Sequence, residues 1–121
     1  MIKFFFSTGI FKLYLFVCLV VIEFLATTTI HIEAMESVWD KANHFTAFFV
    51  LYFLLTFAYK NLSIIVKFLL LLAFGLQIEV VQSFIDGRFF SLLDVFADSI
   101  GILIGIGFVR VIEKKFSRFL T

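Results

Sequence analysis

Four long apolar runs follow one another along the chain and are joined by short polar connections. They cover about residues 11–30, 42–59, 64–85 and 92–112. Each run is close to the ~20 residues with which an α-helix crosses the ~30 Å hydrocarbon core of a membrane. The pattern predicts an all-α integral membrane bundle of four transmembrane helices, in which residues 1–121 form a single membrane domain.

The composition supports this class. Hydrophobic residues make up 63% of the chain, whereas a soluble domain contains about 45–50%. The 20 phenylalanines and the absence of proline favour helices over a barrel, whose strands would alternate apolar and polar residues. Cys18 is the only cysteine, so a cysteine-rich metal site is not expected. The net charge of +1 gives no reason to expect nucleic acid; the expected partner is the lipid bilayer.

The basic residues predict an orientation, because loops rich in lysine and arginine stay in the cytoplasm. Most of them lie before the first run, around the connection between the second and third runs, and after the fourth run. These residues are Lys3, Lys12, Lys60, Lys67, Arg110, Lys114, Lys115 and Arg118. Both termini are therefore expected in the cytoplasm. The acidic connections, 33–41 and 86–91, are expected on the extracytoplasmic side.

The fourth run carries two acids and two glycines at helical spacing. At ~100° per residue, Asp94, Asp98, Gly101 and Gly105 share one face of a helix, with Ser91 near its edge. Small residues at four-residue spacing let a neighbouring membrane helix approach closely. The fourth helix is therefore expected to present one acidic and small face to the rest of the bundle.

The second and third runs carry matching polar residues at the same predicted depth. Gly75, Glu79 and Gln82 share one face of the third run, and Asp40 and His44 lie one turn apart in the second. Burying such groups costs several kcal/mol unless they are paired or hydrated, so each is a candidate functional residue. Three helix ends are thus expected to bring an acid, a base and a carboxamide together.

The residue types suggest separate roles within this predicted pocket. Arg88 can hold a carboxylate or phosphate through two parallel hydrogen bonds, with Lys41 as a second cation. His44 and Glu79 are the candidate acid and base, since only histidine titrates near neutrality unperturbed. Asp94 with Asp98 could bind a divalent cation through oxygen ligands. The predicted ligand-binding residues are Asp40, Lys41, Gln82, Arg88, Ser91, Asp94 and Asp98. Whether a reaction is catalysed stays open.

The spacing of these motifs resembles that of the VanZ-like family of small bacterial membrane proteins. The resemblance covers residues 40–105 and rests on Asp40-Lys41 with His44, Glu79-x-x-Gln82, Arg88-x-x-Ser91-x-x-Asp94 and Gly101-x-x-x-Gly105. The family usually has asparagine at the position of Asp98. It takes its name from a protein associated with low-level resistance to the glycopeptide antibiotic teicoplanin. The resemblance implies the bacterial inner membrane and a role in the cell envelope. Because many relatives occur without a resistance cluster, a general envelope role is expected here ahead of a dedicated role in teicoplanin resistance.

Three hypotheses for the function follow. In the first, the outer polar pocket binds or modifies an envelope lipid or a lipid-linked headgroup. In the second, the chain is a small proton-coupled multidrug transporter that depends on Glu23, a lone acid inside the first run. In the third, it is a structural membrane subunit whose charged groups neutralise one another and hold the helix ends. Replacing Glu23 by glutamine separates the second hypothesis from the first.

Overall fold

The chain folds into helices throughout the part that the structure describes. The computed structural model describes the backbone of residues 8–27, 38–84 and 92–120, and the side chains of 8–26, 42–84 and 92–115. The helices are α2 (Thr8–Thr27), α3 (Val38–Ala58), α4 (Ile64–Gln82) and α5 (Leu92–Leu120). No strand occurs within these ranges. The prediction of an all-α chain with four helices is confirmed.

Several helix boundaries differ from the predicted ones: α2, for example, begins at Thr8 rather than at residue 11. Helix α3 begins at Val38 rather than at residue 42, α4 ends at Gln82 rather than at residue 85, and α5 continues to Leu120. Hydropathy marks only the apolar part of a helix, and charged residues such as Glu113 continue it because they are good helix formers. The start of α4 at Ile64 agrees with the predicted one. Ser63 fixes this start, because its side chain accepts a hydrogen bond of 3.3 Å from the Val66 amide.

Three helices are long and apolar enough to cross a membrane: Thr8–Ala26, Ile64–Gln82 and Leu92–Lys115. Helix α3 carries a shorter apolar stretch, Ala42–Ala58. The outer faces of the long helices expose large apolar side chains, among them Phe16, Phe24, Leu69 and Leu103. Apolar exposure on this scale is uncommon in a soluble monomer. It is consistent with a multi-pass membrane protein in a lipid bilayer.

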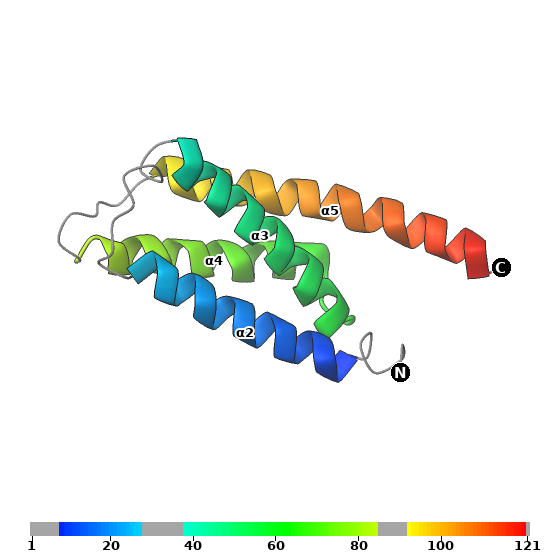
Figure 1. The fold of residues 1–121 in the computed structure, drawn as a ribbon. Helices are drawn as coiled ribbons and strands as arrows, with labels where there is room; N and C mark the ends of the chain where they lie inside the picture. The colour runs from blue at the N-terminus through cyan, green and yellow to red at the C-terminus, as the bar shows by residue number, and fades with distance from the viewer. Residues whose placement is uncertain (1–7, 28–37, 85–91, 121) are drawn as a thin grey trace.

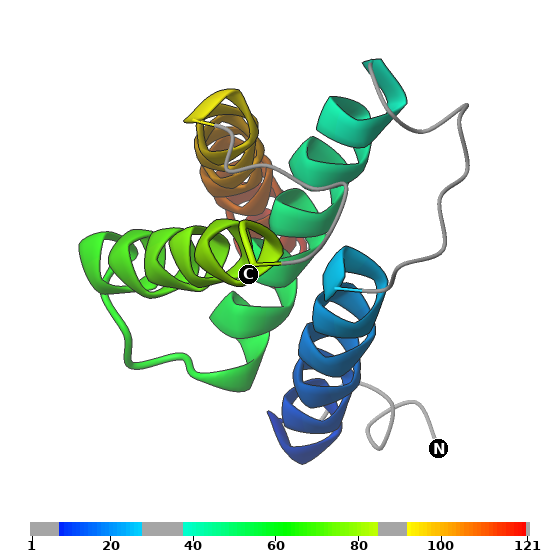
Figure 2. The same ribbon diagram turned by 90° about the vertical axis from the view of Figure 1, so that its left-hand side faces the viewer.

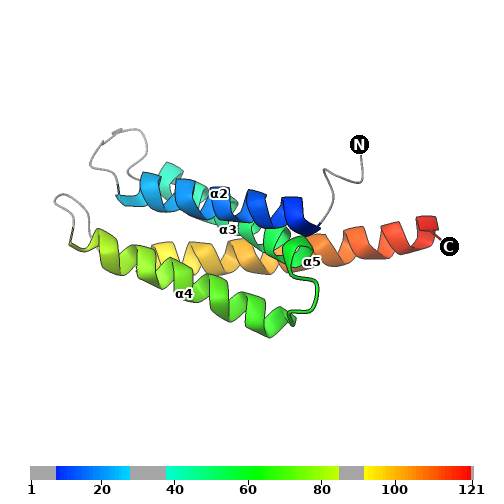
Figure 3. The same ribbon diagram turned by 90° about the horizontal axis from the view of Figure 1, so that it is seen from below.

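Successive helices run in opposite directions (Figure 1). The end of α2, the start of α3, the end of α4 and the start of α5 therefore lie at one end of the bundle, on the left in Figure 1. Helix α3 contacts all three other helices, and most extensively α5. It lies inclined across its neighbours, as Figures 2 and 3 show from the end and from below. This helix therefore organises the bundle.

Aromatic side chains of α3 fill the interior. Phe48 is almost fully buried and packs against Phe74 of α4 at 6.1 Å between ring centroids. Phe49 packs against Phe108 of α5 at 5.2 Å. Tyr52 is also almost fully buried, one turn further along α3. The bulk of these rings separates the polar groups at the two ends of the bundle.

Two glycines of α5 let it approach α3 closely. A Cβ atom at Gly101 would collide with the backbone carbonyl oxygen of Phe45, and one at Gly105 would lie 3.2 Å from the Tyr52 side chain. Such close approach between membrane helices requires small residues. The predicted role of the two glycines is confirmed.

Replacing Gly101 by alanine is expected to destabilise the bundle by about 1–3 kcal/mol, because overpacking at this contact forces the backbones of α3 and α5 apart. Gly107 is the matched control, since a Cβ atom there meets nothing within 4 Å. Gly107→Ala should be neutral or stabilise by about 0.5–1 kcal/mol, the ordinary helix preference for alanine. Free energies of unfolding measured in detergent compare the two. Equal values for both variants would contradict the close contact.

Candidate functional site

Four polar side chains from three helices meet where α3 begins, α4 ends and α5 begins. This end of the bundle is turned toward the viewer in Figure 2. We call His44, Glu79, Asp94 and Asp98 the His44 cluster. His44 lies near the start of α3, Glu79 in the last turn of α4, and Asp94 in the first turn of α5, with Asp98 one turn further. The sequence predicted this convergence from helical spacing. The structure brings all four together.

The imidazole of His44 lies at the centre of the cluster. Its Nδ1 atom lies 2.9 Å from Oδ1 of Asp98, which is hydrogen-bond distance. Its Nε2 atom faces the other two acids, 3.6 Å from Oδ2 of Asp94 and 4.0 Å from Oε1 of Glu79. An ionised carboxylate only accepts hydrogen bonds, so Asp98 holds the proton on Nδ1 and leaves Nε2 directed at Asp94 and Glu79.

The cluster is buried. The side chains of Glu79 and Asp98 have no exposed surface, and those of Asp94 and His44 are 7% and 11% exposed. Acidic side chains are almost never fully buried unless they are paired or bind a cation. Three buried acids around one histidine are a costly arrangement, so they require compensating protons or cations close by.

Gly75 makes room for one of these acids. A Cβ atom at Gly75 would lie 2.6 Å from Oδ2 of Asp98 and 3.2 Å from the ring of Phe48. The glycine therefore lets the Asp98 carboxylate reach in between α4 and α5. This explains why Gly75 shares a helix face with Glu79, as the sequence indicated.

Three members of the cluster have the geometry of a metal site. His44, Glu79 and Asp94 each offer one ligand atom, and these atoms lie within 4.8 Å of one another. Two ligand atoms bound ~2.1 Å from a tetrahedral zinc ion lie about 3.4 Å apart, close to the 3.6 Å between His44 and Asp94. Asp98 would orient the histidine from behind, as carboxylates commonly do for metal-bound histidines. The sequence had instead suggested Asp94 and Asp98 as the cation ligands.

Gln82, a predicted ligand-binding residue, joins two helices. Its Nε2 atom donates a hydrogen bond of 2.7 Å to the backbone carbonyl oxygen of Ala26, in the last turn of α2. Carbonyl groups there have no partner within their own helix. Gln82 is buried and therefore both satisfies the end of α2 and attaches it to α4. Helical periodicity placed Gln82 on the inner face but could not reveal this partner.

Glu23 has a partner that the sequence did not identify. Its Oε1 atom accepts a hydrogen bond of 2.8 Å from Nε2 of Gln77 on α4. Both residues are polar positions inside apolar runs, where each is costly without a partner. The presence of one unexplained polar residue in each of two apolar runs was the feature of the sequence that could have predicted this hydrogen bond.

The structure does not describe the side chains of four predicted site residues. Asp40 and Lys41 lie in the first turn of α3, but their side chains are outside the described part of the structure. Arg88 and Ser91 lie in the range 85–91, which is also outside it. Their assignment to the site stays a prediction from the sequence.

Comparison with protein families gives a match that covers nearly the whole chain. The family model described as VanZ/LLP1 matches residues 2–113. No curated protein and no solved structure matches the chain. The matched range contains nearly the full length and every member of the His44 cluster. The chain therefore belongs to the VanZ/LLP1 family, as the spacing of its polar motifs predicted.

Proposed function

We propose that the His44 cluster is a site that binds or modifies an envelope lipid or a lipid-linked headgroup. The observation that supports this most is the buried His44, held through Nδ1 by Asp98 with its Nε2 directed at Asp94 and Glu79. A histidine oriented by a carboxylate is the arrangement that enzymes use to accept and return a proton. In this role Nε2 of His44 takes the proton from a headgroup hydroxyl or a water.

The remaining acids have complementary roles in this proposal. Glu79 is the second acid–base group, because it lies beside Nε2 and is fully buried. Asp94 stabilises positive charge on the imidazole after proton transfer. The described part of the site is acidic, so it suits a proton, an amine or a divalent cation. The anionic part of a headgroup is assigned to Arg88 and Lys41 on the sequence alone.

The orientation of the chain is also part of this proposal. The His44 cluster lies at one end of the bundle, whereas Lys60, Arg110 and Lys114 belong to the opposite end. Since basic residues mark the cytoplasmic side, we place both termini inside and the His44 cluster at the outer leaflet, where envelope lipids carry their exported headgroups.

Expression of the chain is expected to raise the teicoplanin tolerance of its host, and substitutions in the cluster are expected to remove that gain. His44→Ala removes the base, and Glu79→Gln removes a charge while keeping the size of the side chain. Lys115→Gln removes a charge at an exposed position on α5 and should keep full tolerance. The minimum inhibitory concentration, at equal amounts of protein in the membrane, is the measurement.

Two results would count against this assignment. Variants of His44 and Glu79 that protect as well as the native chain would exclude the cluster as the active element. A native chain that gives no tolerance would exclude the teicoplanin link.

The Nε2 atom that accepts a proton in this proposal can instead bind a divalent cation together with Glu79 and Asp94, so such a cation is expected to stabilise the folded chain and to compete with the acid–base role. Zinc or manganese ions at a hundred times the dissociation constant should add ~2.7 kcal/mol to the free energy of unfolding. Thermal unfolding in detergent, with and without a chelator, measures the effect. Glu79→Gln should abolish it and Lys115→Gln should preserve it. A shift that survives in Glu79→Gln would show that the ion binds elsewhere.

The transporter hypothesis makes a different prediction for Glu23. A proton-coupled exporter needs a carboxylate that binds and releases protons, so Glu23→Gln should abolish export of cationic drugs. Our proposal expects Glu23→Gln to keep teicoplanin tolerance, because the amide oxygen of glutamine can still accept the hydrogen bond from Gln77. Drug efflux and tolerance measured in the same strain separate the two functions.

A further inference from the structure

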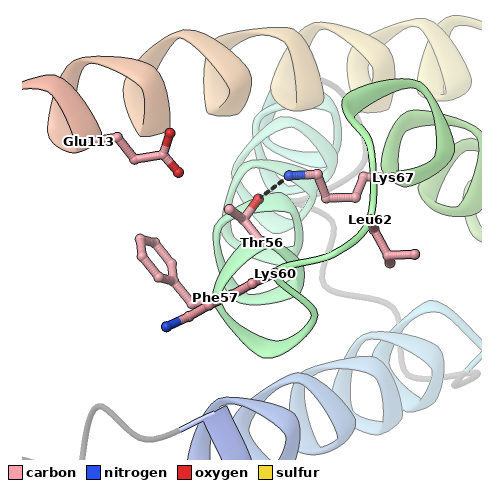
Figure 4. A pocket seen from close by; sticks show the side chains of 6 residues that line it. All are labelled: Thr56, Phe57, Lys60, Leu62, Lys67 and Glu113. Carbon is pink, nitrogen blue, oxygen red and sulfur yellow. Dashed lines mark hydrogen bonds between the residues drawn. The ribbon is translucent and has the colours of Figure 1, made fainter.

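A pocket of about 490 Å³ lies at the end of the bundle opposite the His44 cluster. It is formed by the end of α3, the turn that follows, the start of α4 and the far part of α5. Figure 4 shows its lining residues, which are Thr56, Phe57, Lys60, Leu62, Lys67 and Glu113. Its volume is within the ~300–1,000 Å³ typical of ligand pockets. We call it the Lys67 pocket.

Lys67 is the unusual member of this lining. It lies in the first turn of α4, beside the turn that it was predicted to flank, but it is only 5% exposed. Its Nζ atom donates a hydrogen bond of 3.0 Å to Oγ1 of Thr56 and lies 4.7 Å from the ring centroid of Tyr52. It shares the buried face of α4 with Gly75 and Glu79. The fold therefore holds this ammonium group inside the bundle and away from bulk water.

These contacts do not neutralise the charge of Lys67. A threonine hydroxyl is neutral, and attraction to an aromatic face is worth about 0.5–2 kcal/mol. A buried ammonium ion costs several kcal/mol when nothing of opposite charge lies beside it. No carboxylate among the described side chains lies within ion-pair distance of Nζ. An ammonium has three N–H donors, so Lys67 keeps a donor and its charge for an anion.

The surroundings favour an anion that belongs to the membrane. Lys60 adds a second cation to the lining against the single carboxylate of Glu113. The pocket lies at the end of α3 and the start of α4, and the ends of membrane-crossing helices are where the headgroup region begins. Ile64 and Leu70, three residues before and after Lys67 on α4, expose large apolar side chains next to it on the helix surface. A molecule with a phosphate at one end and acyl chains at the other fits both features, because lysine binds phosphate as a point charge and the chains can lie along α4.

We propose that the Lys67 pocket binds the phosphate group of a membrane-lipid headgroup, with Lys67 as its buried cationic anchor. Thr56 holds the ammonium group in place and Lys60 reinforces the charge from the rim. The site is separate from the His44 cluster and takes lipid from the opposite leaflet.

Thermal unfolding of the full chain in detergent tests the proposal with three additives. Short-chain phosphatidylglycerol should raise the unfolding midpoint, and short-chain diacylglycerol, which lacks the phosphate, should not. Lys67→Gln should weaken the apparent affinity for phosphatidylglycerol about tenfold or more, the effect of losing a hydrogen bond to a charged group. Lys114→Gln removes the same charge from an exposed position on α5 and is the matched control.

The third additive, inorganic phosphate, identifies the source of the anion. Stabilisation by phosphatidylglycerol alone, lost in Lys67→Gln, supports a lipid site. An equal, Lys67-dependent shift with inorganic phosphate supports the phosphate site but overturns the lipid as its source. Equal loss in Lys67→Gln and Lys114→Gln would assign the effect to general surface charge and overturn the proposal. So would a native chain that responds to phosphatidylglycerol no more than to diacylglycerol, a result that needs no variant.

Discussion

The close contact between α3 and α5 at Gly101 is the constraint on which the His44 cluster depends. The backbone of α5 lies against the carbonyl of Phe45, which directly follows His44, and Asp98 precedes Gly101 by about one turn. The hydrogen bond between His44 and Asp98 therefore forms within a rigid pair of helices. On α4, the missing side chain of Gly75 likewise leaves room for the Asp98 carboxylate. Small residues thus fix the positions of the reactive groups, and the reactive groups need not hold the helices themselves.

The bundle places its buried charges at two opposite ends. Carboxylates surround His44 at one end, and Lys67 lies at the other, with the aromatic interior of α3 between them. Charges interact strongly in a medium of low dielectric constant, and each buried charge must be compensated close to where it lies. The two ends therefore differ in the sign of their buried charge, and a change at one end is not expected to neutralise the other.

Much of this arrangement follows from the sequence, because lipid contact demands long apolar runs and makes every polar interruption informative. Helical spacing correctly placed Glu79, Asp94 and Asp98 on inward faces of their helices. It could not supply partners, because these depend on how far each helix rotates and slides against its neighbours. Gln82 therefore proved to join α2 through a backbone carbonyl. Lys67 does flank the turn before α4, as basic residues near a span end usually do, but its spacing of eight and twelve residues to Gly75 and Glu79 also places it on the inward face of α4.

The shortness of the apolar part of α3 affects the membrane around it. Helix α3 has 21 residues, but its uninterrupted apolar stretch begins only after Asp40-Lys41, and at 1.5 Å per residue the stretch Ala42–Ala58 extends about 25 Å, less than a ~30 Å hydrocarbon core. Its inclination across the other helices shortens its reach along the membrane normal still further (Figures 1 and 2). A mismatch of this kind is met by local thinning of the bilayer. We therefore expect the bilayer to be locally thinner beside α3, so that water and lipid headgroups reach His44 without a channel.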